Sequence, residues 1–528
     1  MKDIITSGKT ALGIELGSTR VKAVLIDENC KPLASGAHDW ENKLENGYWT
    51  YSLEDVQIAI HSCFKALKDD VKAKYGCDFK TTGAIGISAM MHGYLAFDKD
   101  GNLLAPFRTW RNTTTAEAAE ELTEKLGFNI PQRWTCSHIY QAILNKEDHV
   151  PKIAYVTTLA GYVHYMLTGV NAVGVGEASG IFPIDSDKND YDENMMATYD
   201  ALLKDKGFGK TLREILPKVL VAGDNAGALT QKGVRFLDAD GDFAVGVPFA
   251  PCEGDAGTGM TATNSVREKT GNISAGTSIF AMIVLENSLS KVYPEIDMVT
   301  TPSGKPVAMV HCNNCTSDIN AWAGLFGEFA SALGIEAKRG KILDLMFENA
   351  MKGDSDCGGL ISYNYFSGEP VTGLQEGRPL FVRTPDAKFT LGNFMRTQLY
   401  SALAALKVGL DLLLKNEKAA IDKIYGHGGF YIYPGVGQKI TAAAIDAPVS
   451  VMKTAGEGGP YGMALLALYS IKGDGLSLED FLEKKAFADA ETVTEEPDQK
   501  DVEGFNVFLS RYVKGLECEK AAVNSIVN

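Results

Sequence analysis

A single carboxylate, Asp255, stands where the sequence predicts that a strand ends and a helix begins. Residues 243–249 predict a buried strand, and the letters EGDAGTGM surround Asp255 with glycines. Glycines permit a tight turn, and the first N–H groups of a helix favour a negative charge. A carboxylate exposed there stays ionised at neutral pH and can accept the proton of a substrate hydroxyl. An aspartate that only caps a helix is the simpler interpretation of this segment alone.

Two short turns of one design are suited to hold phosphate groups. In each, an isoleucine is followed at the third, fourth and fifth positions by a glycine and two hydroxyl residues. They are Gly17, Ser18 and Thr19, continued by Arg20, and Gly276, Thr277 and Ser278. Each predicts a β-hairpin turn whose N–H and hydroxyl groups can cradle phosphate oxygens. The repetition predicts two similar lobes around one cleft, and a chance likeness of two short turns is the alternative.

Two further segments carry side chains suited to a sugar. Residues 83–88 predict a strand that leads to Met91 and His92, and the letters PFRTWRN hold Trp110 and Asn112. An aromatic ring face suits the C–H groups of a sugar, and planar donors suit its hydroxyl groups. A turn histidine with a structural role, or a strand at the edge of the core, would show the same residues.

Hydrophobic periodicity predicts the elements that position these residues. We expect a helix over 52–74, mostly helical structure over 116–220, and a helix over 399–414. A glycine cluster with Gly428 and Gly429 follows, where a flat ring could lie against the backbone. A second cluster, 456–462, opens an Ala/Leu-rich helix. The tail from 488 is acidic up to 503 and then predicts one amphipathic helix packed on the outside.

Composition excludes several classes of partner. The chain has 528 residues, which predicts at least two domains, and its net charge of −16 disfavours nucleic acid and membrane surfaces. A nucleotide is still compatible with this charge, because N–H groups and metal ions hold phosphates locally. Nine cysteines without framework spacing, and no apolar leader or bilayer-length run, predict a cytoplasmic protein with reduced thiols. A homodimer is left open.

These motifs, in this order over residues 11–470, resemble the FGGY family of carbohydrate kinases. IELGSTRVKAVLID and ISAGTS resemble the two phosphate motifs of the family, and EGDAGTGM resembles the segment with its catalytic aspartate. GISAMMHGYLAFD and PFRTWRN resemble its sugar side, and NYFSGE, HGGF and GEGGPYGMALLA its later segments. The resemblance implies an α/β fold of two ribonuclease-H-like lobes, of the actin–hexokinase type, that close on Mg-ATP and a sugar.

The resemblance also implies roles for individual residues. Asp255 matches the catalytic base, and the two turns, with Arg20, match the phosphate site. Gly428, Gly429 and Phe430 match the adenosine site, and Glu15 with Asp255 the Mg²⁺ site. Met91, His92, Trp110 and Asn112, together with Asp255, match the sugar site. The implied domains are an N-terminal lobe over 1–268, a C-terminal lobe over 269–485 and a tail over 486–528.

Three positions depart from the family pattern. The family usually has aspartate at the position of Glu15, and its Trp-x-Asp is Trp110-Arg111-Asn112 here, which removes a charge from the sugar side. Phe430 replaces the small residue that usually follows the adenosine glycines. These departures leave the reaction class intact and bear on which sugar is bound.

The expected function is therefore transfer of phosphate from ATP to the terminal hydroxyl of a ketopentose, xylulose or ribulose. A hexulose, glycerol or another polyol is the alternative within the class. From other classes, the same fold serves ATPase chaperones and filament proteins, and a sugar-sensing regulator without activity would tolerate the departures at Glu15 and Asn112. The intact Asp255 and both phosphate turns favour the enzyme.

Overall fold

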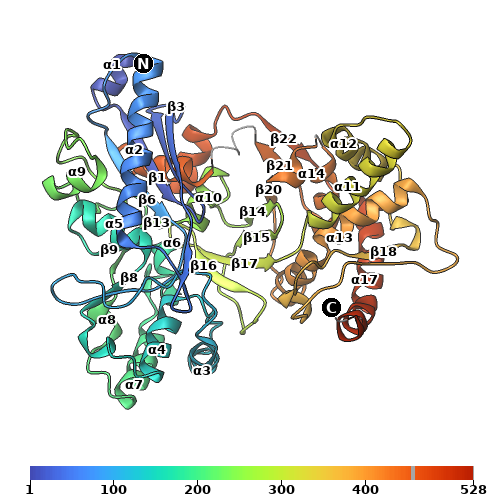
Figure 1. The fold of residues 1–528 in the computed structure, drawn as a ribbon, viewed down its shortest axis with the longest axis horizontal. Helices are drawn as coiled ribbons and strands as arrows, with labels where there is room; N and C mark the ends of the chain where they lie inside the picture. The colour runs from blue at the N-terminus through green and yellow to red at the C-terminus, as the bar shows by residue number, and fades with distance from the viewer. Residues whose placement is uncertain (434, 453–457, 527–528) are drawn as a thin grey trace.

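A computed structural model describes residues 1–433, 435–452 and 458–526, and it contains two mixed sheets, each with helices packed against it. Figure 1 shows the N-terminal sheet on the left, the C-terminal sheet near the middle and helices of the C-terminal lobe on the right. Both sheets are built on one plan, in which an antiparallel hairpin is extended by antiparallel strands on one side and by parallel strands on the other. The expected pair of similar α/β lobes is thereby confirmed.

The N-terminal sheet has the order β13-β6-β1-β2-β3. Its strands are β1 (Thr10–Leu16), β2 (Arg20–Asp27), β3 (Pro32–Asp39), β6 (Ala84–Ala89) and β13 (Glu253–Gly254). β1 pairs antiparallel with β2 and parallel with β6, so the expected first hairpin is present. Because β1, β6 and β13 run parallel, their carboxyl ends meet at one edge of the sheet.

The C-terminal sheet has the order β16-β17-β15-β14-β20-β21-β22. Its strands are β14 (Thr270–Ala275), β15 (Ile279–Val284), β16 (Asp297–Thr300), β17 (Pro306–Cys312), β20 (Lys423–His427), β21 (Val449–Met452) and β22 (Thr492–Glu495). β14 and β15 form the expected second hairpin, and β20 runs parallel to β14. The ends of β14 and β20 therefore lie side by side, as those of β1 and β6 do.

Helix α2 (Leu53–Tyr75) covers one face of the N-terminal sheet. Ser52 caps it by accepting a hydrogen bond from the Asp55 N–H, which explains why the helix starts there. The region after β6 is largely helical, as expected, with short strands between the helices. Its helices are α3 (Ala116–Leu126), α4 (Thr135–Leu144), α5 (Leu159–Thr168), α6 (Val175–Ala178), α7 (Glu193–Asp205), α8 (Leu212–Ile215) and α9 (Gln231–Leu237).

The C-terminal lobe is built around α13 (Leu391–Asp411), which begins eight residues before the expected helix start at 399. The stretch Leu391–Asn416 is the one helix of the described residues that is long and apolar enough to cross a membrane, and 78% of its most apolar window is buried. It is therefore a core helix of this lobe. Around it lie α11 (Ser317–Ala332), α12 (Arg339–Ala350), α14 (Val436–Ile445) and α17 (Gln499–Ser525).

Helix α15 (Gly458–Lys472) comes from the C-terminal half of the chain and packs on the N-terminal sheet, against β1, β2 and β6. Its backbone rests directly on glycines of that sheet: a Cβ at Gly13 would lie 2.1 Å from the Pro460 carbonyl oxygen. The proposed C-terminal lobe, 269–485, thus includes a helix that completes the N-terminal lobe. Gly456 and Glu457, expected to open this helix, lie outside the described residues.

One expectation about an element is wrong. Residues 243–249 form no strand beyond isolated bridges, because the chain turns at Val245 and Gly246, where Gly246 has a φ of 87°. The tail forms the expected amphipathic helix, whose outer face is exposed to solvent. Its strand β22 joins the C-terminal sheet, and α17 buries Phe505, Phe508 and Tyr512 in the core of that lobe.

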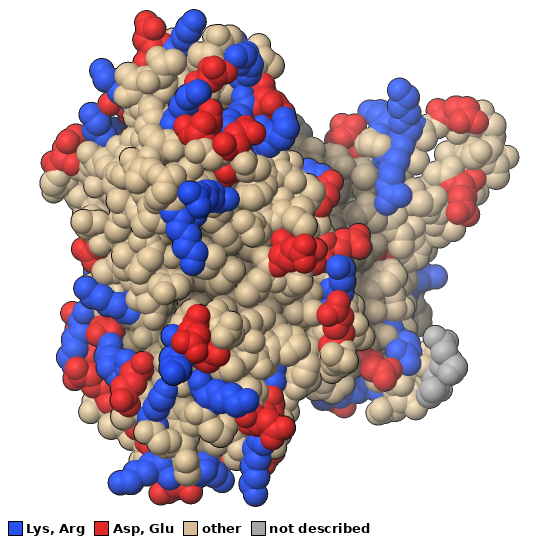
Figure 2. Space-filling model, turned by 60° about the vertical axis from the view of Figure 1, so that its left-hand side comes forward, with Lys and Arg blue, Asp and Glu red and all other residues tan. Residues whose placement is uncertain are grey.

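Charge is distributed over the surface rather than concentrated. On the face of the N-terminal lobe in Figure 2, Lys and Arg side chains are intermixed with Asp and Glu rather than gathered into one basic area. Together with a net charge of −16, this distribution disfavours the binding of a nucleic-acid backbone to that face.

Candidate active site

Asp255 is the first residue of helix α10 (Asp255–Ala262) and follows directly on β13. The preceding residue, Gly254, has to be a glycine, because a Cβ at that position would lie 2.0 Å from the Met91 side chain. The Met91 N–H donates to Asp255 Oδ1 over 3.2 Å. The side chain is exposed to solvent, but the protein packed around it raises the pKa of Asp255, while N–H groups of Met91 and Ala256 act to lower it.

Glu15, on β1, is the second carboxylate of the site. Burial raises the pKa of Glu15 to about 7, and the negative charge of Asp255 contributes in the same direction. The start of α15 closes over this carboxylate, since a Cβ at Gly459 would lie 1.5 Å from Glu15 Oε2. Two neighbouring carboxylates of this kind suit a divalent cation, which would relieve their repulsion.

The first phosphate turn follows directly on β1. A hollow of about 810 Å³ is lined by Glu15, by the turn residues Gly17, Ser18, Thr19 and Arg20, and by Lys22, Asp39, Trp40 and Glu41. The turn and Glu15 therefore lie along one stretch of chain and line one hollow, in which the side chains of Arg20 and Asp39 form an ion pair. The hollow lies where β1 ends, at the same edge of the sheet as Asp255.

The second turn occupies the matching place in the C-terminal sheet. The Gly276 N–H donates to the Ser278 carbonyl over 2.9 Å, and the Thr316 hydroxyl donates to the Gly276 carbonyl over 2.7 Å. Gly428 follows β20 with a φ of 99°, and a Cβ there would lie 2.5 Å from the Ala275 carbonyl oxygen. Glycine is thus required beside the turn.

The other two adenosine-side residues, Gly429 and Phe430, differ in their exposure to a ligand. A Cβ at Gly429 would meet no atom within 4 Å, so space is open above its backbone. Phe430, in contrast, is fully buried, with its ring packed against Phe347 and Tyr431. The Phe430 side chain therefore serves the core of the C-terminal lobe, and only its backbone can face a ligand.

Of the sugar-side residues, Trp110 is accessible to solvent, whereas His92 and Asn112 are buried and contact backbone carbonyl groups. The Trp110 ring is 42% exposed, and its Nε1–H donates to Ser18 Oγ over 3.1 Å. His92 is buried, with Nδ1 3.3 Å from the Gly180 carbonyl oxygen, and burial followed by the charge of Arg133 lowers the pKa of His92. Its imidazole is therefore neutral at physiological pH.

Asn112 is 2% exposed, and its amide is engaged by the backbone. Its Nδ2 donates to the Trp49 and Thr109 carbonyls, over 2.9 and 3.0 Å, and its Oδ1 accepts from the Trp49 N–H over 2.9 Å. The side chain fastens the hairpin of β4 (Lys43–Glu45) and β5 (Tyr48–Thr50) to the segment that holds Trp110. The structure does not bring its donors to the sugar side.

Sequence reasoning missed two buried acids beneath Asp255. Glu177 and Glu253 are at most 1% exposed, and the Glu177 N–H donates to Glu253 Oε2 over 2.9 Å. Burial raises the pKa of Glu253 to about 8 and that of Glu177 well above its usual range. Gly174 and Gly176 make room for the Glu253 carboxyl, because a Cβ at either would lie within 2.3 Å of its oxygens.

An ion pair between the lobes was also missed. Arg133 pairs with Asp297 at the start of β16, and Asn129 Nδ2 donates to Asp297 Oδ1 over 3.1 Å. The Thr300 N–H, at the other end of β16, donates to Ser179 Oγ over 3.1 Å. These contacts join distant parts of the chain, and no local pattern around Arg133 or Asp297 could have indicated them.

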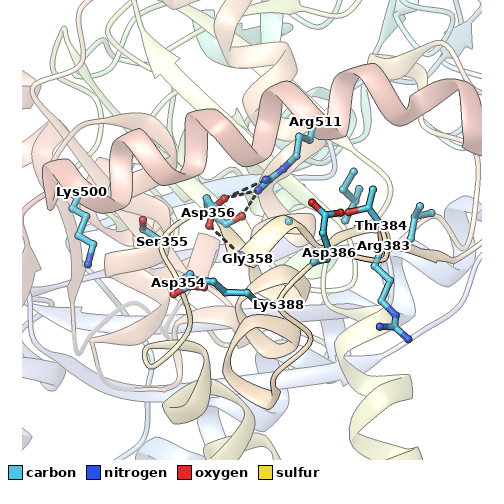
Figure 3. A pocket seen from close by; sticks show the side chains of 14 residues that line it. Asp354, Ser355, Asp356, Gly358, Arg383, Thr384, Asp386, Lys388, Lys500 and Arg511 are labelled. Atoms are coloured by element: carbon cyan, nitrogen blue, oxygen red, sulfur yellow. Dashed lines mark hydrogen bonds and ion pairs between the residues drawn. The ribbon is translucent and has the colours of Figure 1, made fainter.

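A separate hollow of about 580 Å³ lies in the C-terminal lobe, between α17, the segment that leads into β18 (Ile361–Tyr363) and the loop that follows β19 (Leu380–Val382). Figure 3 shows its charged side chains, in which Arg511 pairs with Asp356. Lys388 likewise pairs with Asp354. The residues that line it include neither phosphate turn nor Asp255, so it is not the candidate site.

Comparisons with known proteins match both halves of the chain to one family. Residues 10–261 match the N-terminal domain of the FGGY family of carbohydrate kinases, and residues 271–471 match its C-terminal domain. A xylulose kinase of Haemophilus influenzae is 22% identical over 427 residues, which are 76% of this chain and 79% of that protein.

Two solved structures share the fold over nearly the whole chain. A ligand-bound xylulose kinase from Lactobacillus acidophilus has a TM-score of 0.77 at 17% identity, covering 98% of this chain and 99% of its own. The Plasmodium falciparum glycerol kinase with ADP has a TM-score of 0.72 at 16% identity and covers 98% of both chains. At such identities the likeness establishes the fold alone.

Proposed function

Because the chain belongs to the FGGY family of carbohydrate kinases, we propose that it phosphorylates the terminal hydroxyl of a ketopentose with ATP, most closely in the manner of a xylulose kinase. The single observation that carries the proposal is the position of Asp255, at the start of α10 with Glu15 beside it and a phosphate turn directly after Glu15. A carboxylate and a phosphate-binding turn at one edge of a sheet suit phosphoryl transfer to a hydroxyl.

In this proposal Asp255 is the general base. Its carboxylate accepts the proton of the sugar hydroxyl as the hydroxyl oxygen forms a bond to the γ-phosphorus and the bond to the ADP oxygen breaks. The Met91 N–H, which donates to Oδ1, orients the carboxylate so that the other oxygen is free for the hydroxyl. A raised pKa of Asp255 makes the carboxylate a better proton acceptor than an ordinary aspartate.

The two turns and the glycines after β20 hold the nucleotide. N–H and hydroxyl groups of Ser18, Thr19, Thr277 and Ser278 would contact phosphate oxygens from both lobes, and Gly429 leaves space for adenosine. Glu15 and Asp255 would hold Mg²⁺, directly or through water, and a bound Mg²⁺ neutralises phosphate charge during transfer. Burial, and then the negative charge of Asp255, raise the pKa of Glu15, and a bound cation would offset both effects.

The choice of a ketopentose rests on the relatives. The Haemophilus influenzae protein, matched over 79% of its length, is a xylulose kinase, and Trp110 offers this chain an exposed ring face for sugar C–H groups. Glycerol is the second candidate, since the fold is shared with a glycerol kinase, and a hexulose is the third. We also assign the chain to the cytoplasm, which suits the nine free cysteines.

A coupled ADP-release assay with a panel of ketopentoses, hexuloses and glycerol tests this function through kcat/KM. We expect sugar-dependent turnover that is highest with a ketopentose. Asp255→Asn keeps the side-chain shape and should lower kcat by a factor on the order of 10²–10⁴, while calorimetry still detects sugar binding. Asp148→Asn, an exposed aspartate on another loop, is the matched control and should leave kcat unchanged.

Two results would overturn the proposal. Turnover of ATP that no sugar or polyol accelerates would indicate an ATPase of the chaperone or filament type rather than a kinase. Binding of a sugar without any turnover would indicate a sugar-sensing regulator. Near-normal kcat in Asp255→Asn would remove Asp255 from the role of base and leave the family assignment in place.

A further inference from the structure

All three carbonyl groups of the first phosphate turn accept hydrogen bonds from an aromatic cluster, defined as Trp40 and Tyr51. The Gly17 carbonyl accepts from Trp40 Nε1–H over 2.7 Å, and the Ser18 carbonyl accepts from the Tyr51 hydroxyl over 2.6 Å. The Thr19 carbonyl accepts from the Trp40 backbone N–H over 3.1 Å. Carbonyl oxygens repel phosphate oxygens, so these hydrogen bonds leave the N–H and hydroxyl groups of Ser18 and Thr19 for the ligand, while the Gly17 N–H donates to the Arg20 carbonyl over 3.0 Å.

The aromatic cluster is rigid. Trp40 is 8% and Tyr51 2% exposed, and their rings stack with centroids 4.2 Å apart. A well-packed stacked pair holds its donor atoms in place with little further loss of side-chain freedom. The backbone of the turn is therefore oriented by the core of the lobe, before any nucleotide arrives.

The Ser18 side chain is oriented by a different residue, Trp110. An indole N–H can only donate, so in the 3.1 Å contact between Trp110 Nε1 and Ser18 Oγ the hydroxyl must accept. The Ser18 proton is then directed to another acceptor. A phosphate oxygen in the hollow next to the turn is such an acceptor, and a hydrogen bond to a charged oxygen is a strong one.

Trp110 differs from Trp40 and Tyr51 because its ring is 42% exposed. It comes from the segment that Asn112 fastens to the hairpin of β4 and β5, on the sugar side of the lobe. A sugar stacked on the exposed face would exclude water from the Trp110–Ser18 hydrogen bond. Hydrogen bonds strengthen when water is removed from around them, so the sugar would fix the Ser18 hydroxyl more firmly.

We propose that Trp110 is a positioning residue that links the two substrates: its ring carries the sugar while its N–H sets Ser18 as a donor to the transferred phosphoryl group. The inference rests on the proposed kinase function and deepens it. Without sugar, the exposed indole is hydrated and the Ser18 hydroxyl is free to turn to water. ATP bound alone is thereby held less well for reaction, which limits its hydrolysis.

The test separates the ring of Trp110 from its N–H group. Trp110→Phe keeps an aromatic face and removes the donor, so we expect kcat to fall by about 3- to 10-fold, the effect of one hydrogen bond, with the sugar KM within about twofold of the wild-type value. Trp110→Ala also removes the ring and should raise the sugar KM. Trp49→Phe is the matched control, because the Trp49 ring stacks under Arg111, and should leave both constants unchanged.

A double-mutant cycle with Ser18→Ala tests the link itself. If Trp110 acts through Ser18, the double variant has a kcat no lower than that of the poorer single variant. Effects of the two substitutions that multiply, or a change in Trp110→Phe confined to the sugar KM, would overturn the inference. Thermal melts show that each variant is folded.

Failure of the proposed function gives a different result. In that case the wild-type protein shows no sugar-dependent turnover, and the inference is judged on Mg-ATP binding by calorimetry. Weaker nucleotide binding in Ser18→Ala and Trp110→Phe alike, but not in Trp49→Phe, would support the contact between Trp110 and the turn. Equal affinity in all four proteins would overturn it.

Discussion

The packing of α15 on Gly13 predicts that Gly13→Ala is strongly destabilising. A Cβ at this position would lie 2.1 Å from the Pro460 carbonyl oxygen, 2.4 Å from the Ala464 nitrogen and 3.0 Å from the Met463 carbonyl carbon. All three atoms belong to the helix backbone, which cannot yield as a side chain does. To restore ordinary contact, α15 would have to move from β1 by roughly 1 Å.

Insertion of one methyl group into a packed core usually costs about 1–3 kcal/mol. Because Gly13 contacts the backbone of α15 rather than a side chain, we expect a loss of stability of about 3 kcal/mol, the upper part of that range. For a cooperative unit the size of one lobe, this loss lowers Tm by about 5 °C. Activity should also fall, since Gly459 in the first turn of α15 lies against the Glu15 carboxylate and moves with the helix.

Calorimetry and hydrogen exchange together check this prediction. The matched control is Gly340→Ala in α12, where an added Cβ meets no atom within 4 Å. That substitution should stabilise the protein by about 0.4–1 kcal/mol through the unfolded state. Gly13→Ala should lower Tm and speed exchange of the amides of α15. A Gly13→Ala protein with the wild-type Tm and unchanged exchange would refute the packing of α15 against β1.

Three more predictions concern single side chains. Burial raises the pKa of Glu369 to about 7 from 4.5. Its contribution to stability is therefore full below pH 4.5 and is lost as the pH rises through 7. In urea unfolding, the free energy of unfolding of Glu369→Gln should fall less than that of the wild type between these pH values. Phe508→Ala removes a fully buried ring of α17 and should lower the free energy of unfolding by about 3–5 kcal/mol in the same experiment, whereas an unchanged value would place the tail outside the core. Asn112→Asp replaces a donor by a carboxylate that faces the Trp49 and Thr109 carbonyls. Thermal melts at neutral pH should therefore show a loss of stability on the order of 1–3 kcal/mol. The loss should be partly recovered in acid, where the protonated carboxyl can donate again.

The parts of the fold that local sequence determines were predictable. Both phosphate turns lie in the expected hairpins, and Asp255 begins a helix, because glycine spacing and helix-start chemistry act within a few residues. The roles of individual site residues remain proposals. The strand expected over 243–249 was wrong because the chain turns at Gly246, so that only isolated bridges, such as that of Phe249 with Ile85, form there.

What depends on distant partners could not be predicted. Nothing near Asn112 indicates that its amide binds the Trp49 backbone, and nothing near Phe430 distinguishes a ring in the core from one at a nucleotide. The tail could be predicted as an amphipathic helix, because Phe505, Phe508 and Tyr512 follow amphipathic spacing. Which lobe covers that apolar face is decided by the packing of the whole chain.

The crossing of α15 has a consequence for how the protein is made. When the ribosome has completed α10, the strands of the N-terminal sheet exist, but the helix that rests on Gly13 and Gly86 still has to be synthesised. At 5–20 residues per second, the roughly 200 residues in between take on the order of 10–40 s. During this interval one apolar sheet face is uncovered, so nascent chains are exposed to aggregation and to chaperones. An N-terminal half expressed by itself would keep that bare face permanently, and the two halves are expected to become soluble only when produced together.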